Sequence, residues 1–202
     1  MAGPRPRLAY VLAVDDRDAL TSVVSAIKPL DELEAEHQTA VVQWIASGAD
    51  VYRVAKPATP PQHLVSYVVL VDVGAHAILL VDHRNARLWL PTGGHVEPGE
   101  DPAATAHREL REELGIEGHL LDGLSSNPLF VTQTTTVGGD AGHVDVSLWY
   151  PFTGSLGMKL TPDPGEFADT RWWSFDEIAS APAHTLDPHL PRFVTKLRRE
   201  IS

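Results

Sequence analysis

Three glutamates, Glu109, Glu112 and Glu113, stand at spacings of three and four residues or side by side, so a helix would bring them to one side. Like charges this close cost about 0.2–0.5 kcal/mol per pair in an isolated helix. Hard divalent cations such as Mg²⁺ and Mn²⁺ prefer oxygen ligands and would offset this repulsion. The pattern predicts a metal site, although the same segment alone would also suit an ordinary solvated helix face.

The preceding loop GGHVEPG (93–99) provides backbone freedom beside these acids. Glycines there allow a main-chain carbonyl to point towards a metal, or a phosphate to approach the backbone closely. The loop is not a P-loop, because no Gly-Lys-Ser/Thr follows it. Arg108 is next to Glu109 and four residues before Glu112, where its planar guanidinium could orient two carboxylates.

Local signals define the helix that must carry the glutamates. Asp101 is a helix N-cap residue, Pro102 suits the first helical position, and Gly115 is a C-terminal cap, which together predict a helix over 102–114. Alternating or β-branched segments around it predict strands at 63–73, 76–84 and 87–91, a hairpin over 127–152 with its turn at 138–142, and a strand at 170–175. An amphipathic helix over 187–201, with Pro188 near its start, closes the chain. Strands around a central helix indicate an α+β protein, or α/β/α layers.

The first fifty residues differ from the rest because apolar residues recur there at helical spacing. Two helices are expected at about 15–30 and 30–49, and the proline-rich stretch 55–62 is typical of a linker. We therefore expect a helical N-terminal extension over 1–56 and a catalytic domain over 57–202. The extension could cover the active site, form a homodimer surface or pack on the back of the sheet, and we expect the last.

Composition restricts the partners. The 202 residues carry 16 basic and 27 acidic side chains, a net charge of −11, so duplex nucleic acid is not an expected partner. No cysteine is present, which excludes disulfides, thiolate catalysis and thiolate zinc sites. No segment resembles a signal peptide or a membrane span, and we expect a cytoplasmic location without membrane attachment.

The residues around the glutamates carry a family resemblance. Gly94, Glu100, the run Arg108–Glu109–Leu110, the pair Glu112–Glu113 and Gly115–Ile116 match every specified position of the pattern GX5EX7REUXEEXGU. The chain thus resembles the Nudix hydrolases, and the order of strands from about 63 to 178 is similar to their domain. The resemblance implies an α/β/α sandwich with a mixed sheet.

The resemblance also implies roles. Glu109, Glu112 and Glu113 would bind Mg²⁺, or Mn²⁺ in its place, and the carbonyl of Gly94 would be a further ligand. Glu100 would support the metal site, and Arg108 would orient the glutamates. Members of the family cleave a nucleoside diphosphate linked to another group, and many use a glutamate outside the motif as ligand or general base, a position for which Glu166 is the candidate.

Candidate substrate-binding residues lie near the motif. His95 follows Gly94 directly, and His143, Asp145 and Trp149 alternate along one strand and therefore share a face. That face could line a pocket, with Trp149 or the neighbouring Tyr150 stacking on a base, or it could be simple core. The ten histidines show no HExxH-like spacing, which argues against a zinc hydrolase.

Two function classes follow from these observations. The first is a metal-dependent hydrolase of small nucleotide-type substrates such as ADP-ribose-like compounds, sugar nucleotides or nucleoside triphosphates. The second is a non-catalytic nucleotide-binding or regulatory module on the same fold. An isomerase of isoprenoid diphosphates is a third option, but a catalytic cysteine is normally expected there.

Overall fold

The computed structural model describes residues 14–56, 58–124, 126–136 and 142–202. The helices are α1 (Val14–Ser25), α2 (Glu32–Ala46), α3 (Pro102–Leu114), α4 (Phe175–Ser180) and α5 (Leu190–Glu200). The strands are β1 (Gln62–Asp72), β2 (Ala77–His83), β3 (Leu88–Leu90), β4 (Thr92–His95), β5 (Phe130–Thr135), β6 (Val144–Thr153) and β7 (Phe167–Ser174). The predicted turn of the long hairpin lies largely outside the described residues.

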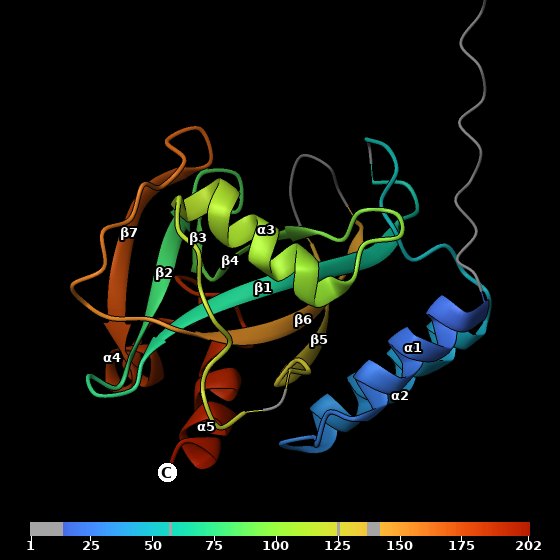
Figure 1. Cartoon of the computed structure of the whole chain (residues 1–202), viewed down its shortest axis with the longest axis horizontal. Helices are drawn as coiled ribbons and strands as arrows, with labels where there is room; N and C mark the ends of the chain where they lie inside the picture. The colour runs from blue at the N-terminus through green and yellow to red at the C-terminus, as the bar shows by residue number, and fades with distance from the viewer. Residues whose placement is uncertain (1–13, 57, 125, 137–141) are drawn as a thin grey trace, which may run out of the picture.

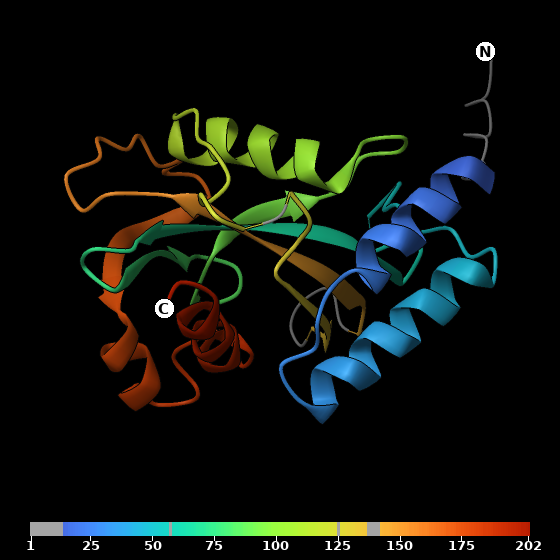
Figure 2. The ribbon, with the colours of Figure 1, turned by 60° about the horizontal axis from the view of Figure 1, so that its bottom comes forward.

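One mixed sheet forms the centre of the molecule. Its main path runs β3-β2-β1-β6-β5, with β4 paired to β1 and β7 paired to β2. The β1–β6 pair is parallel, whereas the other strand pairs are antiparallel. Figure 2 shows α3 above this sheet and the C-terminal helices α4 and α5 below it. The predicted α/β/α layers with a mixed sheet are confirmed.

The helix α3 has the predicted bounds and caps. Asp101 accepts hydrogen bonds from the backbone N–H groups of Ala103 and Ala104, Pro102 occupies the first turn, and Gly115 adopts a left-handed φ of 67°. Its buried stripe includes Ala106, Leu110 and Leu114 and packs on the sheet. The local caps and the apolar stripe thus fix α3 on the sheet, where it contacts β4.

Three elements differ from expectation. The strand β4 was expected as a loop because of its two glycines, but it pairs with β1. The short helix α4 was not expected and is capped by Ser174 and Glu177 in a capping box. The last helix begins at Leu190, so the proline in its first turn is Pro191 and not Pro188.

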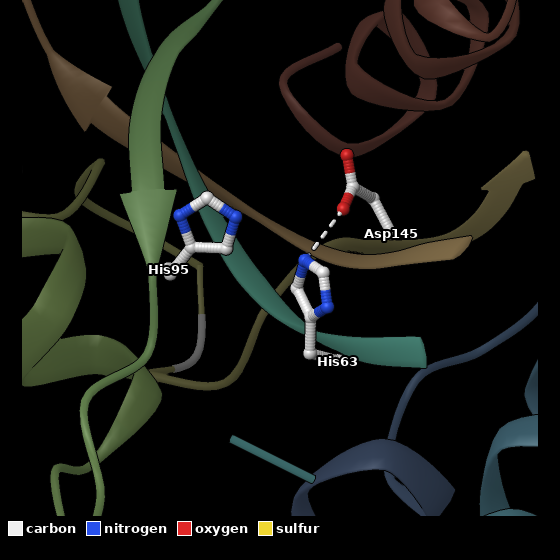
Figure 3. Close-up of side chains that lie close together, drawn as sticks. All are labelled: His63, His95 and Asp145. Atoms are coloured by element: carbon white, nitrogen blue, oxygen red, sulfur yellow. Dashed lines mark ion pairs between the residues drawn. The ribbon is translucent and has the colours of Figure 1, made fainter. Parts of the chain in front are cut away.

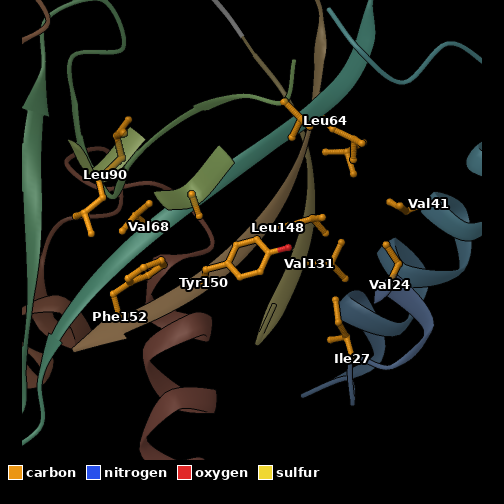
Figure 4. Packing of buried hydrophobic residues seen from close by; sticks show 14 of the residues in the cluster. Val24, Ile27, Val41, Leu64, Val68, Leu90, Val131, Leu148, Tyr150 and Phe152 are labelled. Atoms are coloured by element: carbon orange, nitrogen blue, oxygen red, sulfur yellow. The ribbon is translucent and has the colours of Figure 1, made fainter. Parts of the chain in front are cut away.

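The N-terminal helices share a core with the sheet. Val24 and Val41 are fully buried and belong to the same apolar cluster as Val131 of β5 and Leu148 of β6 (Figure 4). Burying one such side chain stabilises the fold by about 1.5–3 kcal/mol. Figure 1 shows α1 and α2 side by side next to β5.

A second apolar cluster fills the opposite side of the sheet, between the strands and helices α4 and α5. Its large side chains include Phe130, Trp149, Phe175 and Phe193, all with 0–1% exposure. None of the helices within the described ranges is both long and apolar enough to cross a bilayer.

Candidate active site

The carboxylates of α3 converge on β4. Alternation along β4 directs Thr92 and Gly94 towards α3, and the hydroxyl of Thr92 donates to Glu113 Oε2. The Gly93 N–H donates to the same oxygen at 2.9 Å. Gly94 lies against Glu109, because a Cβ at this position would be 2.5 Å from Glu109 Cδ. The backbone of β4 and two glutamates thus form one compact group.

Arg108 connects the remaining acids. Its Nε donates to Glu100 Oε1 and its Nη2 to Glu100 Oε2, both at 3.0 Å, while Nη1 donates to Glu109 at 2.6 Å and Glu112 at 3.0 Å. Nη2 also donates to the carbonyl oxygen of His95 at 3.1 Å. A single guanidinium therefore holds three carboxylates and the end of β4 in a fixed arrangement.

Burial changes the acidity of the two inner glutamates. Burial, together with the charges of Glu109 and Glu166, raises the pKa of Glu113 to about 8, against the opposing hydrogen bond from Thr92. Burial likewise raises the pKa of Glu109, although Arg108 opposes this. Both effects arise because negative charge is crowded into a low-dielectric position with too little compensating positive charge.

Glu100 behaves in the opposite way. Burial acts to raise its pKa, but hydrogen bonds from Arg108 and Thr105 outweigh this and lower it. The hydrogen bonds to Glu100 in turn raise the pKa of Arg108. Among the acids that contact Arg108, Glu100 therefore stabilises the charged guanidinium most.

Glu166 lies in the loop before β7 and is exposed. Its charge contributes to the raised pKa values of both Glu109 and Glu113, so the structure brings it near the motif carboxylates. The backbone N–H of Arg84 donates to the Glu166 carbonyl at 2.9 Å and anchors the loop.

The predicted substrate-binding residues separate into two groups. His95, His143 and Asp145 lie close together, and sequence reasoning missed the residue that joins them, His63 of β1 (Figure 3). Trp149 is not with them: it is fully buried, stacks on Phe193 at 5.1 Å between ring centroids, and donates from Nε1 to Thr132. In this structure the Trp149 ring belongs to the core and does not face a base-binding pocket.

Comparison with known proteins agrees with the geometry. A family model described as NUDIX domain matches residues 61–197. The chain belongs to this family. The predicted family resemblance is thereby confirmed, and the matched range contains the complete motif.

Individual Nudix relatives are diverse. The chain is 29% identical over 132 residues to an NAD-capped RNA hydrolase NudC of Stutzerimonas stutzeri, covering 63% of this chain and 44% of the relative. It is 33% identical over 145 residues to an isopentenyl-diphosphate Delta-isomerase of Streptomyces avermitilis, covering 67% and 68%. The chain spans about half the length of several of the curated relatives that it matches.

Solved structures support the fold. The dihydroneopterin triphosphate pyrophosphohydrolase of E. coli superimposes with a TM-score of 0.54, 17% identity, and coverage of 72% of this chain and 96% of that one. At this identity the likeness concerns the architecture alone.

Proposed function

We propose that this Nudix protein hydrolyses the diphosphate linkage of a nucleoside diphosphate joined to another moiety, using a divalent cation. The observation that carries the proposal is the convergence of three glutamates on β4: Arg108 binds Glu109 and Glu112, Gly94 lies against Glu109, and Thr92 and Gly93 bind Glu113. Substrates of the ADP-ribose or sugar-nucleotide type are favoured over nucleoside triphosphates, and Mg²⁺ is favoured over Mn²⁺.

The residues fit a hard divalent cation. Glu100, Glu109 and Glu112 contact one guanidinium, and Glu109 and Glu113 are largely buried. All the donors are oxygen atoms, as Mg²⁺ prefers. Glu109, Glu112 and Glu113, with the Gly94 carbonyl and support from Glu100, would hold the cation. When bound, it supplies charge neutralisation for the diphosphate and makes water acidic enough to act as a nucleophile near neutral pH.

The protein residues supply orientation and proton transfer. Arg108 keeps Glu109 and Glu112 in place before substrate arrives, which avoids reorganisation during the reaction. Thr92 and Gly93 hold Glu113 through one oxygen and leave its second oxygen for the cation. Glu166, exposed and close to these acids, is our candidate for the base that accepts the proton of the attacking water.

A substrate panel tests the proposal. The full chain is incubated with ADP-ribose, sugar nucleotides, nucleoside triphosphates and NAD-capped RNA, with Mg²⁺, with Mn²⁺ and with chelator, and phosphate is measured after phosphatase treatment. Metal-dependent release from at least one compound is expected. Absence of turnover throughout, together with measurable nucleotide binding, would instead establish the non-catalytic module.

Isomerisation is the second candidate, because the match between this chain and the isomerase relative covers 68% of the relative's length. The chain has no cysteine, which argues against this chemistry. Isopentenyl diphosphate is therefore added to the panel, with its double-bond isomer as the product to detect. Formation of that isomer without phosphate release would replace the hydrolase proposal.

A further inference from the structure

A second polar cluster occupies the opposite side of the sheet from α3. His63 pairs with Asp145 across β1 and β6, and His95 pairs with Val65 across β4 and β1. By alternation, these side chains share the face of Tyr67 and Trp149, away from the motif glutamates. One ligand-type atom from each of His63, His95 and Asp145 lies within 4.8 Å of the others (Figure 3).

His63 is the centre of this cluster and is fully buried. Its Nδ1 lies 3.1 Å from the carbonyl oxygen of Pro60, which can only accept a hydrogen bond, so Nδ1 carries a proton and donates it. A neutral ring with its proton on Nδ1 presents a lone pair at Nε2. That nitrogen is 3.0 Å from Asp145 Oδ1, yet neither atom has a hydrogen-bond partner among the described residues.

The close approach of His63 Nε2 to Asp145 Oδ1 without a hydrogen bond indicates what the pair could bind. In the neutral tautomer with a proton on Nδ1, the Nε2 lone pair and the carboxylate lone pairs lie 3.0 Å apart with no proton between them. Buried polar atoms normally have a partner, and an unpaired one costs about 1–3 kcal/mol. Two ligands of one cation have this relationship, because both lone pairs are directed at a shared third atom.

The ring of His143 is oriented like that of His63, with Nε2 towards Asp145. The Thr136 hydroxyl lies 3.1 Å from the His143 carbonyl, to which it donates, and 2.9 Å from His143 Nδ1. With its one proton used on the carbonyl, the hydroxyl oxygen accepts from Nδ1–H. His143 Nε2 then faces Asp145 Oδ1 at 3.4 Å. Fixing the outer ring nitrogen in this way is typical of histidines that bind metal.

We propose that His63, His95 and Asp145 form a binding site for a transition-metal cation. Zn²⁺ is the cation that fits this site best. His143 is the nearest further donor and completes a fourth position. The site is distinct from the Mg²⁺ site of the motif and does not depend on the proposed hydrolysis.

Ligand chemistry selects the metal. Imidazole nitrogen favours Zn²⁺ and its neighbours in the first transition row, whereas Mg²⁺ requires oxygen ligands. Zinc bonds of about 2.0–2.1 Å in a tetrahedral site place ligands about 3.3 Å apart. The 3.0 and 3.4 Å separations around Asp145 already match this, and His95 would need to move by up to about 1.5 Å.

Arg53 provides the competing explanation. Its Nη1 lies 2.9 Å from His95 Nε2, so three imidazoles and a guanidinium could instead receive an anion. Asp145 argues against this, because its carboxylate, beside His63 and His143, would repel a phosphate but would bind a cation. Arg53 is a long, partly buried side chain that can withdraw, and its positive charge should weaken cation binding.

The site is back to back with the motif across one strand. The side chain of His95 faces the histidine cluster, while its carbonyl oxygen accepts from Arg108 Nη2 at 3.1 Å. Gly94, the residue before it, faces Glu109. A cation on His95 would therefore fix the end of β4 from the side opposite the motif.

Metal titration of the full chain tests the proposal directly. The protein is stripped with chelator, and Zn²⁺ binding is followed by calorimetry and by elemental analysis after gel filtration. One tightly bound Zn²⁺ per chain is expected, and Co²⁺ should bind there with the visible absorption of a tetrahedral centre. Failure to retain Zn²⁺ would overturn the proposal.

Variants locate the ion. Asp145→Asn and His95→Gln should each weaken Zn²⁺ binding by at least about a hundredfold, and His63→Ala should abolish it if it folds. The matched control is His184→Ala, an exposed histidine elsewhere, which should bind like the parent. Equal affinity in the Asp145 and His95 variants would contradict the site.

Two further variants separate the explanations. Arg53→Gln should bind Zn²⁺ at least as tightly as the parent, whereas weaker Zn²⁺ binding would show that Arg53 supports the cluster and does not compete with the cation. Glu112→Gln should lose hydrolysis but keep Zn²⁺ binding. If hydrolysis is absent from the parent while Zn²⁺ binds, only the proposed function fails.

Discussion

Gly94 and Glu109 are in such close contact that no side chain fits between the backbone of β4 and the carboxylate. A Cβ at Gly94 would be 2.5 Å from Glu109 Cδ and 2.9 Å from Oε2. These separations are far below ordinary van der Waals contact. Glycine at this position is thus what allows the carbonyl of β4 and a motif glutamate to approach one cation.

Gly94→Ala should therefore displace Glu109 and lower metal-dependent hydrolysis by on the order of a hundredfold, the effect of about 1 Å of misplacement. Steady-state rates over a Mg²⁺ series measure it. Gly157→Ala is the matched control, since a Cβ there meets nothing within 4 Å and should leave the rate unchanged. Parental activity in Gly94→Ala would exclude this contact from the mechanism.

The contacts of the planar Arg108 guanidinium predict that a positive charge alone is not enough to orient the glutamates. Arg108→Lys keeps the positive charge but cannot contact Glu100, Glu109 and Glu112 together. We expect kcat to fall about 10- to 100-fold. Arg111→Lys on the same helix, whose partner Glu117 is exposed, should be neutral. Similar rates for the two lysine variants would show that Arg108 does not orient the glutamates.

A buried ion pair connects the N-terminal helices to the C-terminal helix. Lys196 Nζ of α5 lies 2.6 Å from Glu34 Oε1 of α2, with side-chain exposures of 4% and 0%. Lys196→Met leaves the Glu34 carboxylate buried without its partner and should lower the free energy of unfolding by about 3–5 kcal/mol. Urea denaturation followed by circular dichroism measures this change.

The double variant Glu34→Gln/Lys196→Met supplies the control for that pair. It removes both charges, and the glutamine oxygen can still accept from the Leu30 N–H, which now donates to Glu34 at 2.6 Å. We expect its stability to lie closer to the parent than to Lys196→Met. A double variant as unstable as the single one would mean that lost packing, not the unpaired charge, causes the effect.

Local signals explain what could be predicted from the sequence. Asp101, Pro102 and Gly115 act within a few residues of the helix they bound, so α3 was predicted to the residue. The strand β4 escaped prediction because its two glycines weaken strand propensity, and only pairing with β1 makes it a strand. The capping box Ser174–Glu177 was a local signal that would have revealed α4.

The histidine cluster could not be found in the same way. His63, His95 and Asp145 are far apart in the chain, and only the pairing of β1 with both β4 and β6 brings them together. Alternation correctly placed Asp145 and Trp149 on one face of β6. It could not show that the ring of Phe193, on α5, covers Trp149, because that depends on tertiary packing.

Asp187, before α5, predicts a pH dependence of stability. It is 7% exposed, and burial raises its pKa to about 6, against the backbone hydrogen bonds from His189 and Leu190. Between about pH 4 and pH 6 the folded state binds a proton that the unfolded state has released, so stability falls as pH rises. Two pKa units correspond to about 3 kcal/mol.

Asp187→Asn keeps an oxygen to accept from the His189 N–H, which donates to Asp187 at 2.8 Å, but it cannot ionise. The difference in unfolding free energy between variant and parent should therefore be small at pH 4 and should grow to about 3 kcal/mol in favour of the variant by pH 7. Asp122→Asn, at an exposed position, should show a difference that does not change with pH. A constant difference for Asp187→Asn as well would show that the carboxyl of Asp187 is not retained in its neutral form by burial.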